Sequence, residues 1–87
     1  MELYMFSAKF CPTCRVVKTG AWNHATNLFK DVGFHYIDVE EEDTLAEIYE
    51  VSTLPAFILM KDNKEVARKT GLITSAEMTR WIEEHKE

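Results

Sequence analysis

The sequence predicts an α/β domain built on a mixed four-stranded sheet with helices on both of its faces. Short apolar and aromatic runs, typical of strands, alternate with segments in which apolar residues recur at helical spacing. In chain order these segments predict strand, helix, strand, helix, strand, strand and helix. The chain has 87 residues and shows no internal repeat or linker, so residues 1–87 are expected to form a single domain.

The first half of the chain has the pattern of a βαβ unit. Residues 2–7 are apolar and aromatic, as in a buried strand, and residues 34–39 form a second such run. Between them the sequence predicts one long helix over residues 12–32. Because two strands connected through a helix usually run in the same direction, this unit predicts parallel strands with a right-handed crossover.

The long helix is predicted from its apolar stripe and from its ends. The stripe recurs at intervals of three and four residues and consists of Cys14, Val17, Ala21, Ala25, Leu28 and Val32. Pro12 suits the first turn of a helix, and Gly33 suits the position after its end. Gly20 lies in the middle, where we expect a local weakness at which the helix kinks.

A short helix and a hairpin are predicted next. Thr44 and Glu47 have the spacing of a capping box, which indicates the start of the short helix. The apolar side of this helix is expected to consist of Leu45, Ile48 and Tyr49. Residues 56–60 and 65–70 form two strand-like runs joined by a short turn, so they are expected to pair as an antiparallel hairpin.

The closing helix has the most complete set of signals. Thr74 and Glu77 form a second capping-box pattern. Ile73, just before the cap, can pack against Met78 as a hydrophobic staple. The buried face of this helix is expected to consist of Met78, Trp81, Ile82 and His85.

Composition and charge narrow the class of partner. The net charge is −5 and no basic block occurs, so the clustered Lys and Arg that bind nucleic-acid phosphates are missing. The longest apolar run, residues 55–60, is too short to span a membrane. The first residues lack the basic and apolar regions of a signal peptide, which predicts a cytoplasmic location. No apolar surface remains unassigned, which favours a monomer.

Two cysteines carry the chemistry that the sequence indicates. Cys11 and Cys14 lie at the junction between the first strand and the long helix. The free N–H groups and the dipole at a helix N-terminus favour an anion, so Cys11 is expected to be exposed with a lowered pKa, assisted by Lys9 and Arg15. Cys14 begins the apolar stripe and is expected to be more buried. This asymmetry predicts that Cys11 attacks a disulfide and that Cys14 resolves the mixed disulfide.

The same spacing also supplies half of a zinc or iron–sulfur site. A structural zinc site needs two further ligands, and the candidates are His24, His35 and His85. No two of these histidines have the close spacing of a second half-site, so neither a metal nor another cofactor is expected. A third interpretation, two unreactive cysteines, is disfavoured by their position at a strand-to-helix junction.

The Cys11–Cys14 segment (Cys-Pro-Thr-Cys) and the order of the elements resemble the thioredoxin/glutaredoxin superfamily over nearly the whole chain. The most specific part is Val51–Phe57, Val-Ser-Thr-Leu-Pro-Ala-Phe, which is similar to the segment that carries the cis-proline of that family. The remainder, with a strand ending at Gly71, resembles a thioredoxin, since a glutaredoxin usually has a paired glycine there for glutathione. The chain is similar to small, phage-type thioredoxins that lack the amino-terminal strand and helix.

The resemblance implies roles for individual residues. Cys11 matches the nucleophile, Cys14 the resolving thiol, and Pro55 the cis-proline that faces the disulfide. Leu54 matches the residue whose backbone pairs with an extended substrate, and Gly71 matches the glycine that lets a substrate chain approach closely. The substrate-binding surface that the resemblance implies consists of Phe10, Pro12, Thr13, Thr53, Leu54, Pro55 and Gly71.

Three features differ from the usual thioredoxin pattern. Pro12 and Thr13 stand between the cysteines in place of Gly-Pro, and Phe10 replaces the usual tryptophan. Met5 stands where thioredoxins bury an aspartate that helps to move the proton of the resolving cysteine. Cys14 is therefore expected to lose its proton to water or to another group.

The function that the resemblance implies is that of an enzyme, a thiol–disulfide oxidoreductase that reduces protein disulfides. Its cofactor-free redox centre would be the Cys11–Cys14 disulfide, recharged by a donor of the thioredoxin reductase type. Ribonucleotide reductase is one substrate that the family implies. Two alternatives are a glutathione-recharged glutaredoxin and a non-catalytic subunit that clamps a partner through Phe10, Leu54 and Gly71.

Overall fold

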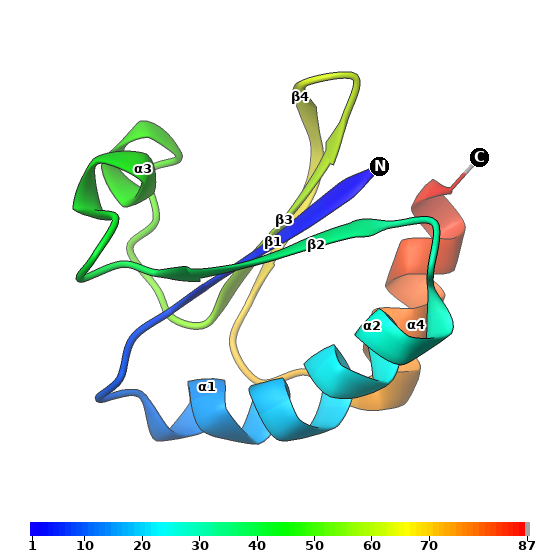
Figure 1. Cartoon of the computed structure of the whole chain (residues 1–87), viewed down its shortest axis with the longest axis horizontal. Helices are drawn as coiled ribbons and strands as arrows, with labels where there is room; N and C mark the ends of the chain where they lie inside the picture. Colours follow the sequence, from blue (N-terminus) through cyan, green and yellow to red (C-terminus); the bar gives the residue numbers. More distant parts are fainter. Residues whose placement is uncertain (87) are drawn as a thin grey trace.

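The computed structural model describes residues 1–86, and within them four strands form one mixed sheet (Figure 1). The strands are β1 (Glu2–Ser7), β2 (Gly33–Asp38), β3 (Ala56–Lys61) and β4 (Lys64–Thr70). Their order across the sheet is β2-β1-β3-β4, with β1 and β2 parallel and the other neighbouring pairs antiparallel. The predicted βαβ unit, antiparallel hairpin and mixed sheet are confirmed.

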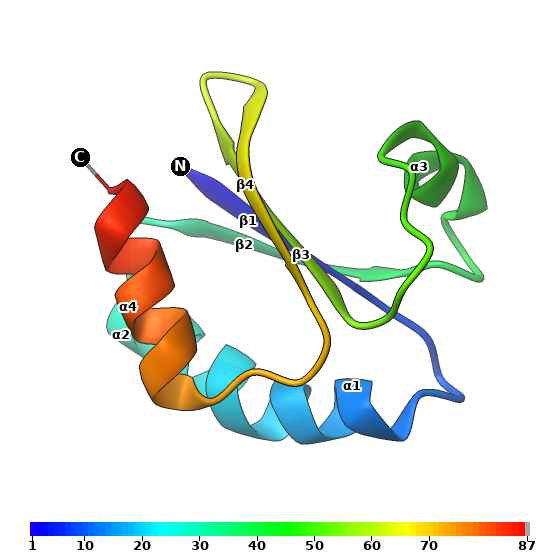
Figure 2. The same ribbon diagram turned by 180° about the vertical axis from the view of Figure 1, so that it is seen from behind.

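Helices cover both faces of this sheet, as the sequence predicts (Figure 2). On one face lie α1 (Pro12–Val17), the π-helical segment η1 (Lys18–Trp22), α2 (Asn23–Leu28) and α4 (Ser75–His85). The other face is covered by the short helix α3 (Asp43–Ile48). No helix within the described part of the chain is long and apolar enough to cross a membrane.

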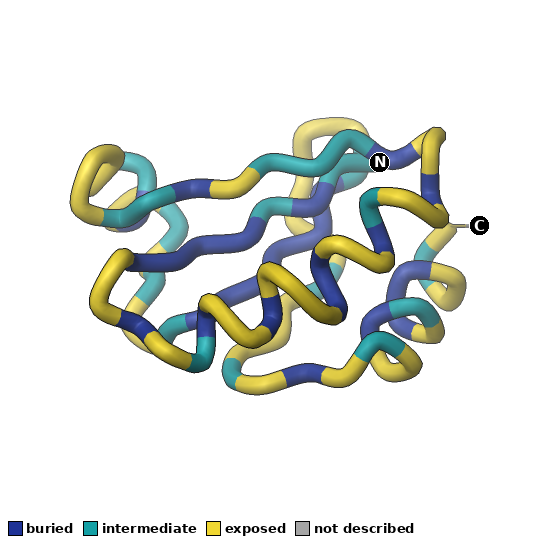
Figure 3. The backbone as a smooth tube through the Cα atoms, turned by 60° about the horizontal axis from the view of Figure 1, so that its bottom comes forward, coloured by how far each residue is buried: buried dark blue, intermediate teal, exposed yellow. Residues whose placement is uncertain are grey.

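The sheet separates two hydrophobic cores. Leu3 and Met5 of β1 pack on the face of the long helical segment, whereas Phe6 packs on the α3 face. Phe57 and Ile58 of β3 divide in the same way. Successive strand residues point to opposite faces, which is why both central strands are mostly apolar along their length. Figure 3 shows these strands as the most continuously buried part of the chain.

The long helix differs from its prediction in the middle and at its end. It contains the π-helical turn η1 around Gly20, the position where a weakness is expected, and it ends at Leu28 instead of residue 32. A π turn holds an additional residue and so rotates the positions that follow it. Leu28, predicted to be on the buried stripe, is therefore 51% exposed, while Phe29 is buried.

The start of α3 was also predicted wrongly. Glu42 is the N-cap residue and has no capping hydrogen bond from its side chain, so the capping box expected at Thr44 and Glu47 is not formed. The backbone N–H groups of Glu41 and Glu42 both donate to the carbonyl of Asp38, which turns the chain directly into the helix. Thr44 therefore already lies inside the first turn. Ile48, expected on the apolar side, is exposed.

The hairpin and the closing helix agree closely with their sequence signals. Asp62 and Asn63 both have positive φ angles, 53° and 65°, as the two central residues of a type I′ turn require. At the start of α4, the Thr74 hydroxyl accepts from the Glu77 N–H and the Glu77 carboxylate accepts from the Thr74 N–H. The predicted capping box at this helix is confirmed.

Candidate functional site

Cys11 occupies the N-cap position of α1. Its Sγ atom accepts a hydrogen bond from the backbone N–H of Cys14 at 3.2 Å, and Pro12 fills the first position of the helix. The first turn of α1 contains no acidic residue, so no carboxylate competes with a thiolate for the helix N-terminus. The sequence folds this way locally because Pro12 favours a helix start and the residue before a proline favours an extended backbone.

The pKa of Cys11 is lowered from its ordinary value. Burial by itself raises the pKa of this thiol, but hydrogen bonds from Cys14 and Thr13 to the sulfur outweigh that effect. A thiolate that already accepts hydrogen bonds needs less stabilisation from water. The structure thus favours the reactive, ionised form of Cys11.

Cys14 lies in the opposite environment. Its side chain is completely buried, and burial, together with the hydrogen bond to Cys11, raises the pKa of this thiol. Hydrogen bonds from the Ser7 side chain and the Ala8 backbone act in the other direction without reversing the shift. The pKa values of the two thiols, one helical turn apart, are therefore shifted in opposite directions, so Cys11 ionises more readily than Cys14.

Cys11 is less exposed than predicted, but it is more exposed than Cys14, as predicted. Cys11 is only 8% exposed, compared with 0% for Cys14. The backbone N–H of Cys11 donates to the carbonyl of Ala8 at 3.2 Å, so residues 8–11 form a turn that folds Cys11 back against the helix. Cys11 remains the more accessible of the two thiols.

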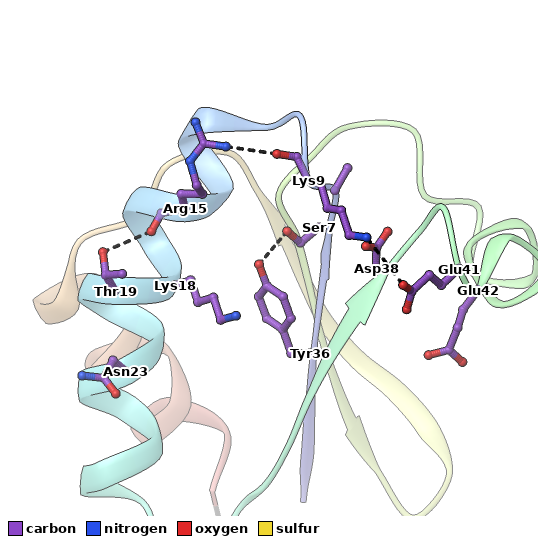
Figure 4. A pocket seen from close by; sticks show the side chains of 11 residues that line it. Ser7, Lys9, Arg15, Lys18, Thr19, Asn23, Tyr36, Asp38, Glu41 and Glu42 are labelled. Carbon is purple, nitrogen blue, oxygen red and sulfur yellow. Dashed lines mark hydrogen bonds and ion pairs between the residues drawn. The ribbon is translucent and has the colours of Figure 1, made fainter.

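Lys9 and Arg15, expected to assist Cys11, are engaged elsewhere. The Arg15 guanidinium donates to the carbonyl of Lys9 at 3.0 Å, and the Lys9 ammonium forms an ion pair with Glu41 at 3.8 Å (Figure 4). These contacts join the loop before α1 to the helix and to the segment after β2. Hydrogen bonds rather than these cations account for the lowered pKa of Cys11.

The Leu54–Pro55 peptide bond is cis, as the resemblance implies. Phe6 pairs with Ala56 across β1 and β3, so Pro55 lies beside the end of β1, where the chain departs toward Cys11. The carbonyl of Pro55 accepts from the N–H of Gly71 at 2.8 Å, and Gly71 has φ 87°, a conformation that favours glycine. The loops that contain Pro55 and Gly71 therefore meet at this end of the sheet.

The predicted substrate-binding residues have unequal access to solvent. Phe10 is 70% exposed, and Pro12 and Thr53 are exposed as well. Thr13, Leu54 and Gly71 are half-buried, and Pro55 is buried. The structure adds an exposed apolar side chain that sequence reasoning missed, Leu72, which follows Gly71 and is 64% exposed. Its position next to that glycine is the signal that could have indicated it.

Sequence reasoning also missed two polar residues, Ser7 and Tyr36, as part of the site. Ser7 is 2% exposed, its hydroxyl oxygen lies 2.8 Å from that of Tyr36, and its side chain lowers the pKa of the Cys14 thiol. Met5, which the resemblance places where thioredoxins bury an acid, is fully buried in the core. The signal in the sequence was a serine at the end of an apolar and aromatic run, since a buried hydroxyl group needs a hydrogen-bond partner.

The histidines do not complete a metal site. His24 is exposed on α2, while His35 contacts Glu2, and His85 contacts the carbonyl of Trp81. Among residues 1–86, no three His, Cys, Asp or Glu side chains are grouped as a metal ion requires. Nothing in the described donor set favours the zinc interpretation of the cysteine pair.

A Cys-x-x-Cys pair at a helix N-terminus, with the pKa of one thiol lowered and that of the other raised, is the machinery of a thiol–disulfide oxidoreductase. Residues 2–84 match the family model "Thioredoxin". The chain is 39% identical to a thioredoxin of Chlamydia pneumoniae over 85 residues, which is 98% of this chain and 82% of that protein. It is 38% identical to thioredoxin H2-2 of Oryza sativa, but spans only 48% of that longer relative.

Solved structures show the same relationship. The thioredoxin NaTrxh from Nicotiana alata superposes with a TM-score of 0.91 at 31% identity, over 99% of this chain and 73% of that one. The Fasciola hepatica thioredoxin superposes with a TM-score of 0.90 at 28% identity, over 98% and 80%. The chain belongs to the thioredoxin family. It is a thiol–disulfide oxidoreductase with the cysteine pair Cys11 and Cys14, consistent with the cofactor-free redox chemistry of that family.

Proposed function

We propose that Cys11 is the attacking thiol and Cys14 the resolving thiol in the reduction of protein disulfides. The observation that supports this division is the contrast between the thiols. Cys11 is the more accessible and has the lowered pKa, whereas Cys14 is fully buried with a raised pKa. An attacking thiol must ionise readily and be reachable, and Cys11 meets both conditions better than Cys14.

The reaction proceeds in two exchanges. The Cys11 thiolate attacks one sulfur of a substrate disulfide, that S–S bond breaks, and the other substrate sulfur leaves as a thiolate and takes a proton from water. Cys14 then loses its proton and attacks the Cys11 sulfur. The Cys11–Cys14 disulfide forms, and the second substrate sulfur departs as a thiolate. Two electrons pass from the cysteine pair to the substrate.

The surface around Cys11 is proposed to hold the substrate chain. Phe10 and Leu72 are exposed apolar side chains, and Leu54 directly precedes the cis-proline Pro55. An extended substrate would pair with the backbone at Leu54, which gives affinity with little side-chain specificity. Gly71, which has no Cβ atom, leaves space for that chain. The full proposed surface consists of Phe10, Pro12, Thr13, Thr53, Leu54, Pro55, Gly71 and Leu72.

Thioredoxin relatives imply protein disulfide substrates and a reductase as electron donor in general. The finer assignment proposed here is a donor of the thioredoxin reductase type, with ribonucleotide reductase as one substrate. We place this activity in the cytoplasm, in a monomer that consists of one domain. Supplying reduced glutathione and a thioredoxin reductase in separate assays tests the donor, and faster recharging by glutathione would favour the glutaredoxin alternative.

Insulin reduction by dithiothreitol tests the division of roles. Wild-type protein should accelerate the precipitation of the insulin B chain, whereas Cys11→Ser and Cys14→Ser should not. Cys14→Ser should accumulate a mixed disulfide with insulin, and Cys11→Ser should not. No acceleration by folded wild-type protein, or trapping by the Cys11→Ser variant instead, would overturn the proposal.

A further inference from the structure

Ser7 is the one buried polar residue recorded among residues 1–86, and its position is specific. It ends β1, where it points to the same sheet face as Met5 and Leu3, toward the long helical segment. Tyr36 pairs with Met5 on the neighbouring strand, so its side chain reaches Ser7 diagonally across the two strands. The two hydroxyl oxygens lie 2.8 Å apart (Figure 4).

The resolving step requires a proton to leave a place that water does not reach. Cys14 is 0% exposed, and its raised pKa keeps the thiol protonated near neutral pH. Met5, its neighbour in the same core, can neither accept nor donate this proton. The hydroxyl group of Ser7 can do both. Its side chain points to the sheet face on which Cys14 is packed, and it lowers the pKa of the Cys14 thiol.

Tyr36 connects this buried pair to solvent. Its side chain is 37% exposed and, with Ser7, lines an open cleft of about 910 Å³ between the long helix and β2. The Lys18 ammonium lies 4.4 Å from the centre of the Tyr36 ring. The charged groups facing the cleft are Lys9, Arg15, Lys18, Asp38, Glu41 and Glu42.

We propose that Ser7 and Tyr36 form the path by which the proton of Cys14 reaches solvent during the resolving step. Cys14 Sγ, Ser7 Oγ and Tyr36 Oη lie in sequence from the core to the cleft. The path itself contains no carboxylate. The inference rests on the proposed role of Cys14 as the resolving thiol.

The proton balance along this path is complete. The Cys14 proton passes to Ser7 Oγ, the former Ser7 hydroxyl proton passes to Tyr36 Oη, and the Tyr36 hydroxyl proton passes to water in the cleft. Both hydroxyl groups are restored, and one proton has left the protein. The new Ser7 O–H group then donates to the Cys14 thiolate, which agrees with the direction in which Ser7 shifts the pKa of Cys14. The thiolate attacks the Cys11 sulfur of the mixed disulfide as described above.

A chromogenic disulfide separates the two exchanges. When 5,5′-dithiobis(2-nitrobenzoate) reacts with reduced protein, the attack by Cys11 releases one coloured thiolate, and the attack by Cys14 on the resulting mixed disulfide releases the second. Rapid-mixing measurements from pH 5 to pH 10 give the pH profile of each release. The Cys14→Ser variant should lose the second release and keep the first. A second release from this variant would contradict the resolving role of Cys14.

Ser7→Ala should slow the second release by about fivefold to tenfold at neutral pH, the amount expected for one lost hydrogen bond. Its half-maximal rate should move to higher pH, because the bond that lowers the pKa of Cys14 is gone. Tyr36→Phe should produce a smaller shift in the same direction, while the first release stays unchanged in both variants. Ser7→Thr, which keeps a hydroxyl group, should restore most of the rate.

Thr19→Ala is the matched control. The Thr19 hydroxyl also lines the cleft, but it donates to the carbonyls of Arg15 and Val16 and touches neither thiol. This variant should leave both releases unchanged. If the pH profile of the second release is unshifted in Ser7→Ala and Tyr36→Phe, the proposed path is overturned. The path is also overturned if Ser7→Ala slows the second release equally at every pH and Ser7→Thr does not restore the rate.

Discussion

The N-termini of α1 and α4 contain the same type of capping hydrogen bond but have different roles. In α4 the Thr74 hydroxyl accepts from the N–H of Glu77 at 3.1 Å, and in α1 the Cys11 sulfur accepts from the N–H of Cys14 at 3.2 Å. In α4 the Glu77 side chain returns a hydrogen bond to the cap. In α1 the corresponding residue, Cys14, is buried and provides the second thiol instead.

This difference shows how a helix cap, which usually contributes stability, can also tune the reactivity of a side chain. A capping side chain satisfies N–H groups that the helix itself leaves without partners. When the capping atom is a hydroxyl oxygen, the gain is stability. When it is a sulfur, the same N–H stabilises the thiolate and lowers the pKa of Cys11. The two helix starts can therefore be perturbed separately.

The largest expected effect comes from Cys11→Ser. Disulfide reduction should fall to the uncatalysed rate, because no thiolate remains to attack. The free energy of unfolding, measured by urea denaturation of the reduced proteins, should be unchanged or slightly higher, since serine is among the best N-cap residues. A clear loss of stability would show that the sulfur also has a structural role that the capping hydrogen bond does not explain.

The contrast in pKa between the two thiols should appear in their rates of alkylation. With iodoacetamide under reducing conditions, Cys11 should reach its half-maximal rate at lower pH than an ordinary cysteine, and Cys14 at higher pH. The direction follows because only the thiolate reacts, so a lowered pKa moves the profile to lower pH. Mass spectrometry of the modified peptides reports each site, and equal profiles would contradict the asymmetry.

Thr74→Ala tests the other helix start. It should lower the free energy of unfolding by about 1 kcal/mol, the usual cost of losing a side-chain cap. The thermal midpoint should fall by about 4–8 °C for each kcal/mol in a domain of this size. The activity per folded molecule should not change. Thr74→Ser, which keeps the hydroxyl group, is the control and should retain nearly full stability.

The smallest expected effect concerns the acid side of the α4 capping box. Hydrogen bonds from the backbone and side chain of Thr74 lower the pKa of Glu77. Glu77 therefore contributes stability above its unfolded pKa, about 4.3, and that contribution is lost as the pH falls through the lower, folded value. The free energy of unfolding, measured by urea denaturation, should therefore fall less on acidification in Glu77→Gln than in the wild-type protein. The alkylation profile of Cys11 should stay the same.

The same comparison shows which features a sequence pattern can predict. The cap at Thr74 and Glu77 was predicted correctly because every group in it lies within one helical turn. The spacing of Thr44 and Glu47 is identical, yet no cap forms there, because the turn at Asp38 starts α3 two residues too early, with Glu42 as the N-cap. Likewise, the spacing of the apolar residues placed Leu28 on the buried stripe of the long helix, but the π turn η1 rotates this residue toward solvent.

What the sequence by itself determined is local: the order of strands and helices, and a thiol at the N-cap of a helix with a second thiol one turn inside it. What only the tertiary structure decided depends on segments far apart in the chain. Ser7 and Tyr36 are 29 residues apart, and they meet because β1 and β2 pair in one parallel register. Register and packing follow from all the buried side chains together, so the polar partners of a buried thiol cannot be read from the residues beside it.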